Sequence, residues 1–218
     1  MNILSPCPEP IVEQWLNSPP QSLEDEIGRV VLIEVFQVNC PGCFLYSLPA
    51  AVDLYQRYKD KGLSVWGIAT AFEDFEINTL DNLKKLLFEN IVVGETLNAL
   101  TQQNRLIDNR LPYHLPFPVA MDQLNPANDI PQANLHQMAE NYVSDYAKLN
   151  ETEQKTARQS LNDYLKNQQR CGQTFQQFRL QGTPSHLLID KQGRLRAVEF
   201  GYFAELEWTL GNLLAECL

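Results

Sequence analysis

The sequence predicts an α/β fold built on a central mixed sheet, and two patterns carry this prediction. Val30–Phe36 is a short apolar segment rich in β-branched residues, and residues 63–71 form a second one beyond a helical stretch. Strand, helix and strand in this order imply a parallel, right-handed crossover. Residues 185–190 and Leu195–Phe200 flank a turn at residues 191–193 and predict an antiparallel hairpin. Parallel and antiparallel strands together make the sheet mixed.

Length and composition favour one folded domain covering residues 1–218. The chain is 44% hydrophobic and 20% charged, close to the globular average, which excludes a disordered, collagen-like or coiled-coil chain. Its 17 basic and 27 acidic residues give a net charge of −10. This charge disfavours attraction to phosphate backbones and anionic lipids, so we expect neither nucleic acid nor membrane as a partner.

No apolar run approaches the roughly 20 residues that span a bilayer. Residues 1–10 lack the basic head and apolar core of a signal peptide. We therefore expect a cytoplasmic location.

The segments between the first strand and residue 121 alternate between helical and extended patterns. A helix of about four turns follows Cys43 and ends near Gly62. Its apolar residues recur at helical spacing: Leu45, Leu48, Val52, Tyr55 and Tyr58. Leu80 to Leu87 and Leu97 to Ile107 predict two further helices or one broken helix. Residues 115–121 are apolar but contain two prolines, which favours a strand near a sheet edge.

A change of composition predicts that residues 124–179 are a helical insertion in the single domain. Two apolar stripes at helical spacing run through it, with outer faces rich in Gln and Asn. The first stripe contains Leu135, Met138, Ala139, Tyr142, Val143, Tyr146 and Leu149, and the second contains Ala157, Leu161, Tyr164, Leu165, Gln168, Cys171, Phe175 and Phe178. We interpret them as two helices that form a lid or a docking face. Beyond the hairpin, Leu206 to Leu214 predict a terminal helix.

The motif Cys40-Pro41-Gly42-Cys43 lies where the first strand turns into a helix. The first cysteine is then at the helix N-terminus, where free amide groups and the macrodipole favour the reactive thiolate. The second thiol lies one turn further, within reach of a disulfide. Half of a zinc site is the alternative, but no second Cys/His pair has ligand spacing. We predict a redox dithiol with no metal and no cofactor.

The segment VLIEVFQVNCPGC resembles the active-site region of thioredoxin-like proteins. These carry an acidic residue six positions and an aromatic residue four positions before the first cysteine, and Glu34 and Phe36 occupy those places. Asn39 stands where thioredoxins usually have Trp, and the usual Gly-Pro order between the cysteines is reversed. The helix proline is displaced by one position, to Pro49. We expect these differences from thioredoxins to affect the redox potential and the choice of partner rather than the dithiol chemistry.

Gly182-Thr183-Pro184, followed by SHLLIDKQGRLR, is similar to the cis-proline loop and hairpin of the redoxin group. The resemblance implies a three-layer thioredoxin-like fold and a loop that faces the cysteines and offers backbone groups to an extended substrate. The substrate contacts that it implies are Phe36, Pro41, Gly42, Thr183 and Pro184.

The leading hypothesis is a thiol-disulfide oxidoreductase in which Cys40 attacks a disulfide and Cys43 resolves the mixed disulfide. Its partners would be a disulfide-containing protein or small molecule and an external thiol reductant or reductase. Side-chain alternation along the strand places Glu34 beneath the active-site turn. There it would either exchange protons with Cys43 or form a structural ion pair.

Two other functions are open. Peroxiredoxins, which share the redoxin resemblance, have a threonine three positions and a proline seven positions before the nucleophile, where this chain has Gln37 and Ile33. A peroxidase is therefore a weaker hypothesis. A non-catalytic, redox-sensing interaction module is the third. Cys171, on an apolar stripe, is expected to be a buried hydrophobe. His186 follows Pro184 by two residues, but we expect a packed or solvated strand histidine rather than one that reaches the active-site surface.

Overall fold

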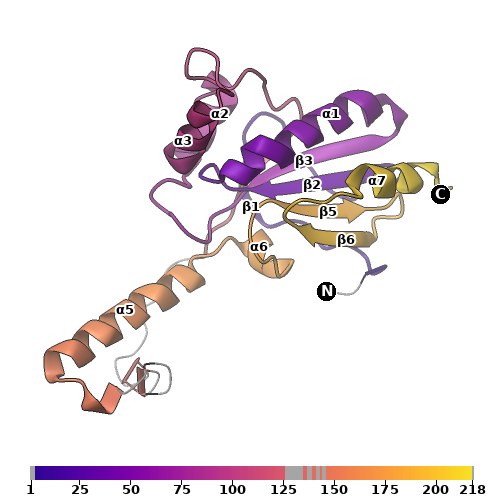
Figure 1. Cartoon of the computed structure of the whole chain (residues 1–218). Helices are drawn as coiled ribbons and strands as arrows, with labels where there is room; N and C mark the ends of the chain where they lie inside the picture. The colour runs from indigo at the N-terminus through magenta and orange to yellow at the C-terminus, as the bar shows by residue number, and fades with distance from the viewer. Residues whose placement is uncertain (1–2, 126–134, 137–138, 141–142, 144–145, 218) are drawn as a thin grey trace.

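The computed structural model describes residues 3–217 except 126–134, 137–138, 141–142 and 144–145, and a six-stranded mixed sheet forms its centre (Figure 1). The strand order is β1-β4-β3-β2-β5-β6. The strands are β1 (Val12–Trp15), β2 (Val30–Phe36), β3 (Leu63–Ala69), β4 (Val119–Asp122), β5 (Ser185–Ile189) and β6 (Leu195–Phe200). Strands β2, β3 and β4 run parallel, and the other pairings are antiparallel. The predicted mixed sheet is confirmed.

Helices cover both faces of this sheet and give a three-layer arrangement (Figure 1). The helical elements are a π turn (Cys43–Ser47), α1 (Leu48–Tyr58), a 3-10 turn (Lys59–Lys61), α2 (Leu80–Glu89), α3 (Gly94–Gln102), a 3-10 turn (Tyr146–Lys148), α5 (Glu151–Gln169), α6 (Gln173–Gln177) and α7 (Leu206–Ala215). Helices α1 and α7 pack with one face of β2, and the segment around α6 packs with the opposite face.

Strand β2 is buried along its whole length and divides its side chains between two cores. Leu32 and Phe36 belong to the core under α1, whereas Ile33 and Val35 belong to the core on the α6 side. Because successive side chains of a strand point to opposite faces, Glu34 lies on the same face as Leu32 and Phe36. The only charged residue of the strand therefore points toward the helix that carries the cysteines.

Strand β4 lies one position in from the edge, because β1 takes the edge beside it. The prediction of a strand near the edge was thus close, but it started the strand too early. Both prolines precede Val119, so neither removes a hydrogen bond from the sheet. Strand β1 was not predicted; it has only four residues and alternates weakly, although Trp15 packs edge-on against Trp66 with ring centres 5.4 Å apart.

The predicted helices of residues 80–107 are two separate ones. Helix α2 ends at Glu89 and is capped by Asn90, which has a left-handed φ of 57°, and α3 begins at Gly94, which also has a φ of 57°. A side chain at Gly94 would collide with Asn39, because a Cβ there would lie 2.3 Å from the Asn39 Oδ1. The extension of the second helix to Ile107 was wrong, since α3 ends at Gln102 and Ile107 is exposed.

Of the helix predicted over residues 135–149, residues 137–138, 141–142 and 144–145 lie outside the described residues. Of its stripe, Leu135, Ala139 and Tyr146 are described and buried. The second predicted helix, residues 157–178, is divided into α5 and α6. Helix α5 projects from the sheet, and we call α5 with the turn Tyr146–Lys148 the arm (Figure 1).

The division between α5 and α6 has a local cause at Gly172. A Cβ there would lie 1.9 Å from Asp122 Oδ2, so only glycine fits. The Asp122 carboxylate accepts hydrogen bonds from the backbone N–H groups of Thr174 and Phe175, at 2.8 and 3.2 Å, and so starts a new helix. Cys171, Phe175 and Phe178 then pack in the core beneath β2 and β5.

Candidate active site

The Cys40-Pro41-Gly42-Cys43 motif forms a disulfide at the start of the helix that follows β2. The Cα atoms of Cys40 and Cys43 are 5.4 Å apart. Cys40 is half-buried and Cys43 is fully buried. The backbone N–H of Cys43 donates to Cys40 Sγ at 3.2 Å. In the reduced protein this amide would stabilise a Cys40 thiolate, because hydrogen bonds to the charged form favour it.

The helix after Cys43 starts with a π turn, in which the Leu48 N–H donates to the Cys43 carbonyl five residues back. The Ser47 hydroxyl donates to the same carbonyl at 3.3 Å. A π turn holds one more residue than an α turn, which fits the one-residue displacement of Pro49 noted in the sequence. Because Pro49 has no N–H, the irregular turn lies where a regular helical hydrogen bond would be missing in any case.

The loop before β5 faces the disulfide. The Thr183–Pro184 peptide bond is cis. Cys40 Sγ lies 3.5 Å from the Thr183 carbonyl oxygen, and a Cβ at Gly42 would lie 3.9 Å from Pro184 Cδ. The Thr183 hydroxyl donates to Gln37 Oε1 at 3.3 Å, which connects the loop to the end of β2. Two segments more than 140 residues apart thus meet at the redox pair.

Asn39, at the position usually held by Trp in thioredoxins, holds a neighbouring loop and helix. Its Nδ2 donates to Asp74 Oδ2 at 2.8 Å, and its Oδ1 accepts from the Glu95 N–H in the first turn of α3 at 2.7 Å. Gln37 Nε2 donates to the carbonyl of Glu73 in the same loop at 3.4 Å. These bonds fix the acidic loop beside the site.

Phe36 is fully buried and packs edge-on against Phe44, with ring centres 6.3 Å apart. It therefore lies beneath the site, and any effect on a substrate would act through the turn above it. Pro41 and Gly42, in contrast, are half-buried in the segment that faces Pro184.

Glu34 lies in the sheet with a partner that sequence reasoning did not assign to it. Both Glu34 and His186 are buried, and they are register partners on β2 and β5. His186 Nδ1 lies 2.8 Å from Glu34 Oε1, and its Nε2 lies 2.8 Å from the Gly201 carbonyl oxygen. Burial lowers the pKa of His186, but the charge and hydrogen bond of Glu34 and the Gly201 carbonyl outweigh it, so the pKa is raised.

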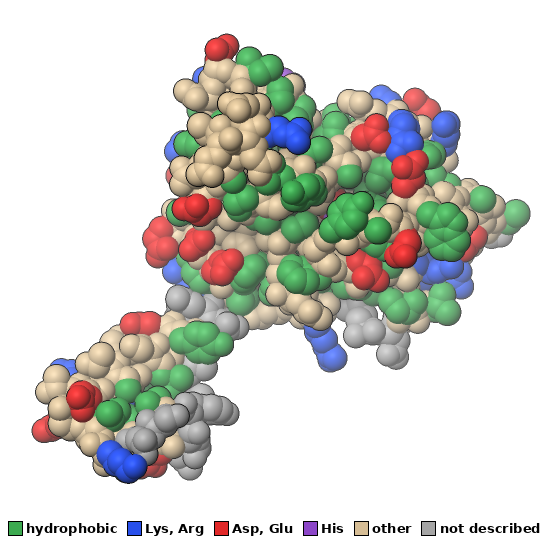
Figure 2. Space-filling model, viewed as in Figure 1, with side chains coloured by type: hydrophobic (Ala, Val, Ile, Leu, Met, Phe, Trp, Pro, Cys, Tyr) green, Lys and Arg blue, Asp and Glu red, His purple; other side chains and the backbone are tan. Residues whose placement is uncertain are grey.

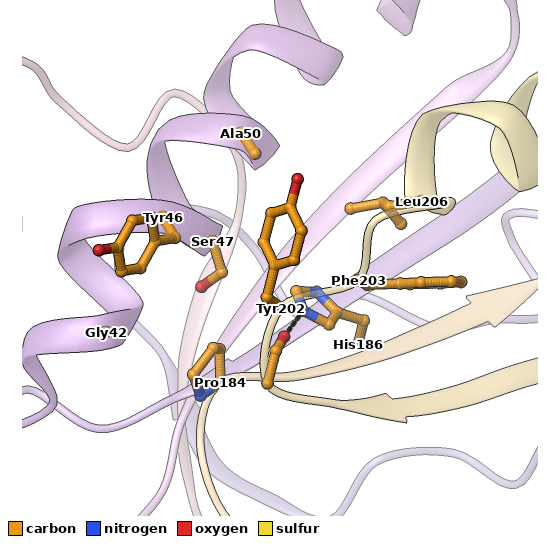
Figure 3. A pocket seen from close by; sticks show the side chains of 10 residues that line it. Gly42, Tyr46, Ser47, Ala50, Pro184, His186, Tyr202, Phe203 and Leu206 are labelled. Atoms are coloured by element: carbon orange, nitrogen blue, oxygen red, sulfur yellow. Dashed lines mark hydrogen bonds between the residues drawn. The ribbon is translucent and has the colours of Figure 1, made fainter.

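An apolar groove of about 290 Å³ runs from the cysteine turn to the loop after β6 (Figure 3). The residues that line it are Gly42, Tyr46, Ser47, Ala50, Pro184, His186, Gly201, Tyr202, Phe203 and Leu206. Tyr46 and Tyr202 are 61% and 83% exposed, whereas His186 is 2% exposed. The groove thus joins the disulfide and the cis-proline loop to the buried Glu34–His186 pair.

None of the helices in the described part of the chain is long and apolar enough to cross a membrane. Within the same residues, no group of three or more His, Cys, Asp and Glu side chains is placed to hold a metal ion.

Comparison with known proteins places this geometry among redox proteins. No family model matches the chain. Protein DipZ from Mycobacterium bovis and from Mycobacterium tuberculosis is 42% identical over 65 residues, which are 28% of this chain and 9% of DipZ. The similarity therefore spans a small part of those longer relatives.

Two solved structures cover 97% of this chain and 97% of their own length. One is a thioredoxin-like superfamily protein, SPOA0173, with a TM-score of 0.60 and 26% identity. The other is a thiol-disulfide isomerase from Corynebacterium glutamicum, with a TM-score of 0.59 and 27% identity. This chain has a thioredoxin-like fold. A thioredoxin-like protein solved in its oxidised form, 18% identical with a TM-score of 0.53, agrees on the fold.

The thioredoxin-like fold and the redoxin resemblance predicted from the sequence are confirmed by these structures. The Corynebacterium glutamicum protein is a thiol-disulfide isomerase, and this chain carries a CxxC disulfide at the start of a helix. The pairing of Glu34 with His186 is the part of the site that sequence reasoning missed. The sequence indicated that both residues lie in buried strands, but it did not indicate the register that makes them neighbours.

Proposed function

We propose that this thioredoxin-like chain is a thiol-disulfide oxidoreductase, with Cys40 as nucleophile and Cys43 as resolving cysteine. The observation that carries the proposal is the meeting of the half-buried Cys40 with the Thr183–Pro184 loop. The buried Cys43 lies one turn behind it. An accessible thiol at a helix N-terminus, backed by a second thiol within bonding distance, suits disulfide exchange.

The reaction needs no cofactor. The Cys40 thiolate attacks one sulfur of a substrate disulfide, a mixed disulfide forms, and the other substrate sulfur leaves as a thiolate. The Cys43 thiolate then attacks Cys40 Sγ, so the Cys40–Cys43 bond forms as the bond to the substrate breaks. The substrate gains two electrons and the protein becomes the disulfide. An external thiol reductant or reductase must return those electrons, for which a cytoplasmic location would be suitable.

The substrate would lie along the Thr183–Pro184 loop, where the Thr183 carbonyl is close to Cys40. Pro41 and Gly42 would form the opposite side of this contact. A disulfide-containing protein segment or a small disulfide meets the requirement, because the groove beside the cysteines is apolar and open.

Alkylation of the reduced protein near neutral pH tests the assignment of the cysteines. Burial, with a smaller contribution from Glu9, raises the pKa of Cys7 to about 12, and burial also raises the pKa of Cys171. In a Cys217→Ser background, which removes an exposed thiol, mass mapping should find Cys40 modified first. Faster modification of Cys43 or Cys171 would show that the assignment is wrong.

Trapping tests the reaction itself. Cys43→Ser should accumulate a mixed disulfide with a model disulfide substrate, whereas Cys40→Ser should form none. If the wild-type protein turned over hydrogen peroxide rapidly with a thiol reductant, the peroxidase hypothesis would replace this one. We expect Cys40 to react with peroxide as an ordinary thiol does. Gln37 is hydrogen-bonded to Thr183 and to Glu73, and Ile33 points into the core on the α6 side of the sheet.

A further inference from the structure

The protonation state of the Glu34–His186 pair follows from its hydrogen bonds. The Gly201 carbonyl can only accept, so His186 Nε2 carries a proton. The 2.8 Å contact between Nδ1 and Glu34 Oε1 needs a second proton between the two atoms. Without it, a nitrogen lone pair would face a carboxylate oxygen in a buried site. The pair therefore holds two protons, one of them shared with Glu34.

The other oxygen of Glu34 is free. Glu34 Oε2 is buried and accepts no hydrogen bond from the described residues. A buried carboxylate oxygen without a donor is costly unless its charge is balanced or its basicity is used. His186 balances the charge through Oε1. Oε2 is consequently an unoccupied proton acceptor on the same face of β2 as the core that contains Cys43.

We propose that His186 is a positioning residue for the dithiol reaction, holding Glu34 as a carboxylate whose second oxygen accepts the proton of Cys43. This inference rests on the proposed function. In the mixed disulfide, the proton of the Cys43 thiol moves to Glu34 Oε2, directly or through a water molecule. The thiolate attacks Cys40 Sγ, and the substrate leaves as a thiolate. The proton on Glu34 then returns to solvent or to the leaving thiolate by way of the groove, which His186 also lines.

The surroundings of His186 favour its charged form. Glu199 on β6 is its register partner and adds a second negative charge to that of Glu34. From the helical side the groove presents Tyr46 and Ser47, and from the loop after β6 it presents Tyr202 and Phe203. Among the described residues, Glu34 and Glu199 are thus the carboxylates that act on the ring, and the raised pKa of His186 agrees with this arrangement.

The substitution His186→Gln separates charge from shape. Glutamine can donate one hydrogen bond to Glu34 but carries no positive charge to balance that of the carboxylate. We expect resolution of the mixed disulfide to slow about tenfold at pH 7 and its pH profile to differ from that of the wild type, because the charge that faces Glu34 is removed. Rapid-quench measurement should find the initial attack by Cys40 nearly unchanged. His114→Gln, which replaces an exposed histidine, is the matched control.

A double variant distinguishes positioning from a merely structural role. If His186 acts through Glu34, then Glu34→Gln with His186→Gln should resolve the mixed disulfide no more slowly than Glu34→Gln alone. Independent structural losses would multiply instead and overturn the proposal. An unchanged pH profile in His186→Gln, with wild-type turnover intact, would also overturn it while leaving the oxidoreductase assignment in place.

A second measurement does not depend on turnover or on the folding of a His186 variant. Nuclear magnetic resonance of the imidazole nitrogens in the reduced wild-type protein should show both nitrogens of His186 protonated above pH 7. Glu34→Gln should lower the pH at which this signature is lost. A neutral His186 ring at pH 7 in the wild type would overturn the proposal, whatever the activity of the protein.

Discussion

The active site and the arm are built in different ways. At the active site, contacts join residues far apart in sequence, such as Cys40 with Thr183 and Glu34 with His186. Among the described residues of the arm the contacts are local: Arg158 donates to the Tyr146 hydroxyl, and Gln154 donates to the Leu149 carbonyl at 3.0 Å. Figure 2 shows the arm standing apart from the rest of the molecule. The difference suggests that the core folds as one unit to which the arm is added.

The junction between the core and the arm, unlike the arm itself, contacts residues far away in the sequence. Phe72, in the loop after β3, stacks on Phe175 with ring centres 4.6 Å apart. The Arg170 guanidinium lies 4.7 Å from the centre of the Phe75 ring. The end of the predicted insertion therefore contacts the loop that Gln37 and Asn39 hold beside the cysteines.

The largest expected effect comes from removing the whole predicted insertion. Replacing residues 124–179 by a short linker deletes Cys171, Phe175 and Phe178 from the core beneath β2. Loss of one buried Phe side chain already costs about 3–5 kcal/mol, and a domain has only about 5–15 kcal/mol in total. We expect this variant not to fold, as measured by circular dichroism and thermal unfolding.

The matched variant replaces residues 126–169 only and keeps those three side chains. It should fold and retain Cys40–Cys43 redox activity, with altered choice among protein substrates if the arm is a lid or docking face. A folded, active protein after the longer replacement would move the boundary of the insertion back to 179. Unfolding after the shorter replacement would make the arm part of the core.

The second largest expected effect is on the reaction rate and comes from replacing Glu34, whose contact with His186 joins distant parts of the sequence. Glu34→Gln keeps the shape and removes the base, so resolution of the mixed disulfide should slow by about 10²-fold or somewhat less, while attack by Cys40 changes little. The mixed disulfide should then accumulate in rapid-quench samples. Equal resolution rates in the two proteins would reduce Glu34 to a structural partner of His186.

Local sequence patterns predicted those features that depend on residues close together in the sequence. Alternation along β2 predicted that Glu34 is buried on the cysteine side, and the CxxC spacing predicted the redox pair. The partner of Glu34 depends on the register of β2 against β5, across 152 residues, which no local pattern encodes. Similarly, the continuous stripe from Ala157 to Phe178 concealed the break at Gly172. That break exists because Asp122 and Thr70 fill the space beside the glycine.

The smallest expected effect lies at the far end of the hairpin that carries Pro184 and His186. Asp190 is buried where β5 turns toward β6. Its carboxylate accepts from the backbone N–H of Arg194 at 2.9 Å and forms ion pairs with Arg194 and Arg196 at 2.9 and 3.2 Å. Burial acts to raise the pKa of Asp190, but these hydrogen bonds together outweigh it, and the pKa is lowered.

A carboxylate with a lowered pKa in the folded state stabilises the fold above its unfolded pKa of about 3.9, and this contribution is lost as the pH falls through the folded value. Asp190→Asn should therefore lower the free energy of unfolding at neutral pH by about 1–3 kcal/mol, as expected for a hydrogen bond to a charged group. The difference from wild type should shrink below pH 4, where the wild-type carboxylate also becomes protonated.

Urea unfolding at pH 7 and at pH 3 measures both values, and Glu207→Gln is the control. Glu207 also has a lowered pKa, first because Arg57 donates a hydrogen bond to it. It is exposed on α7, so its removal should leave the pH dependence of stability nearly unchanged. Because Asp190 lies at the opposite end of β5 from Pro184, the Asp190→Asn protein should keep its rate of disulfide exchange while it is folded. A slower disulfide exchange in the folded variant would show instead that the hairpin turn at Asp190 and the redox site at Cys40 are coupled through β5.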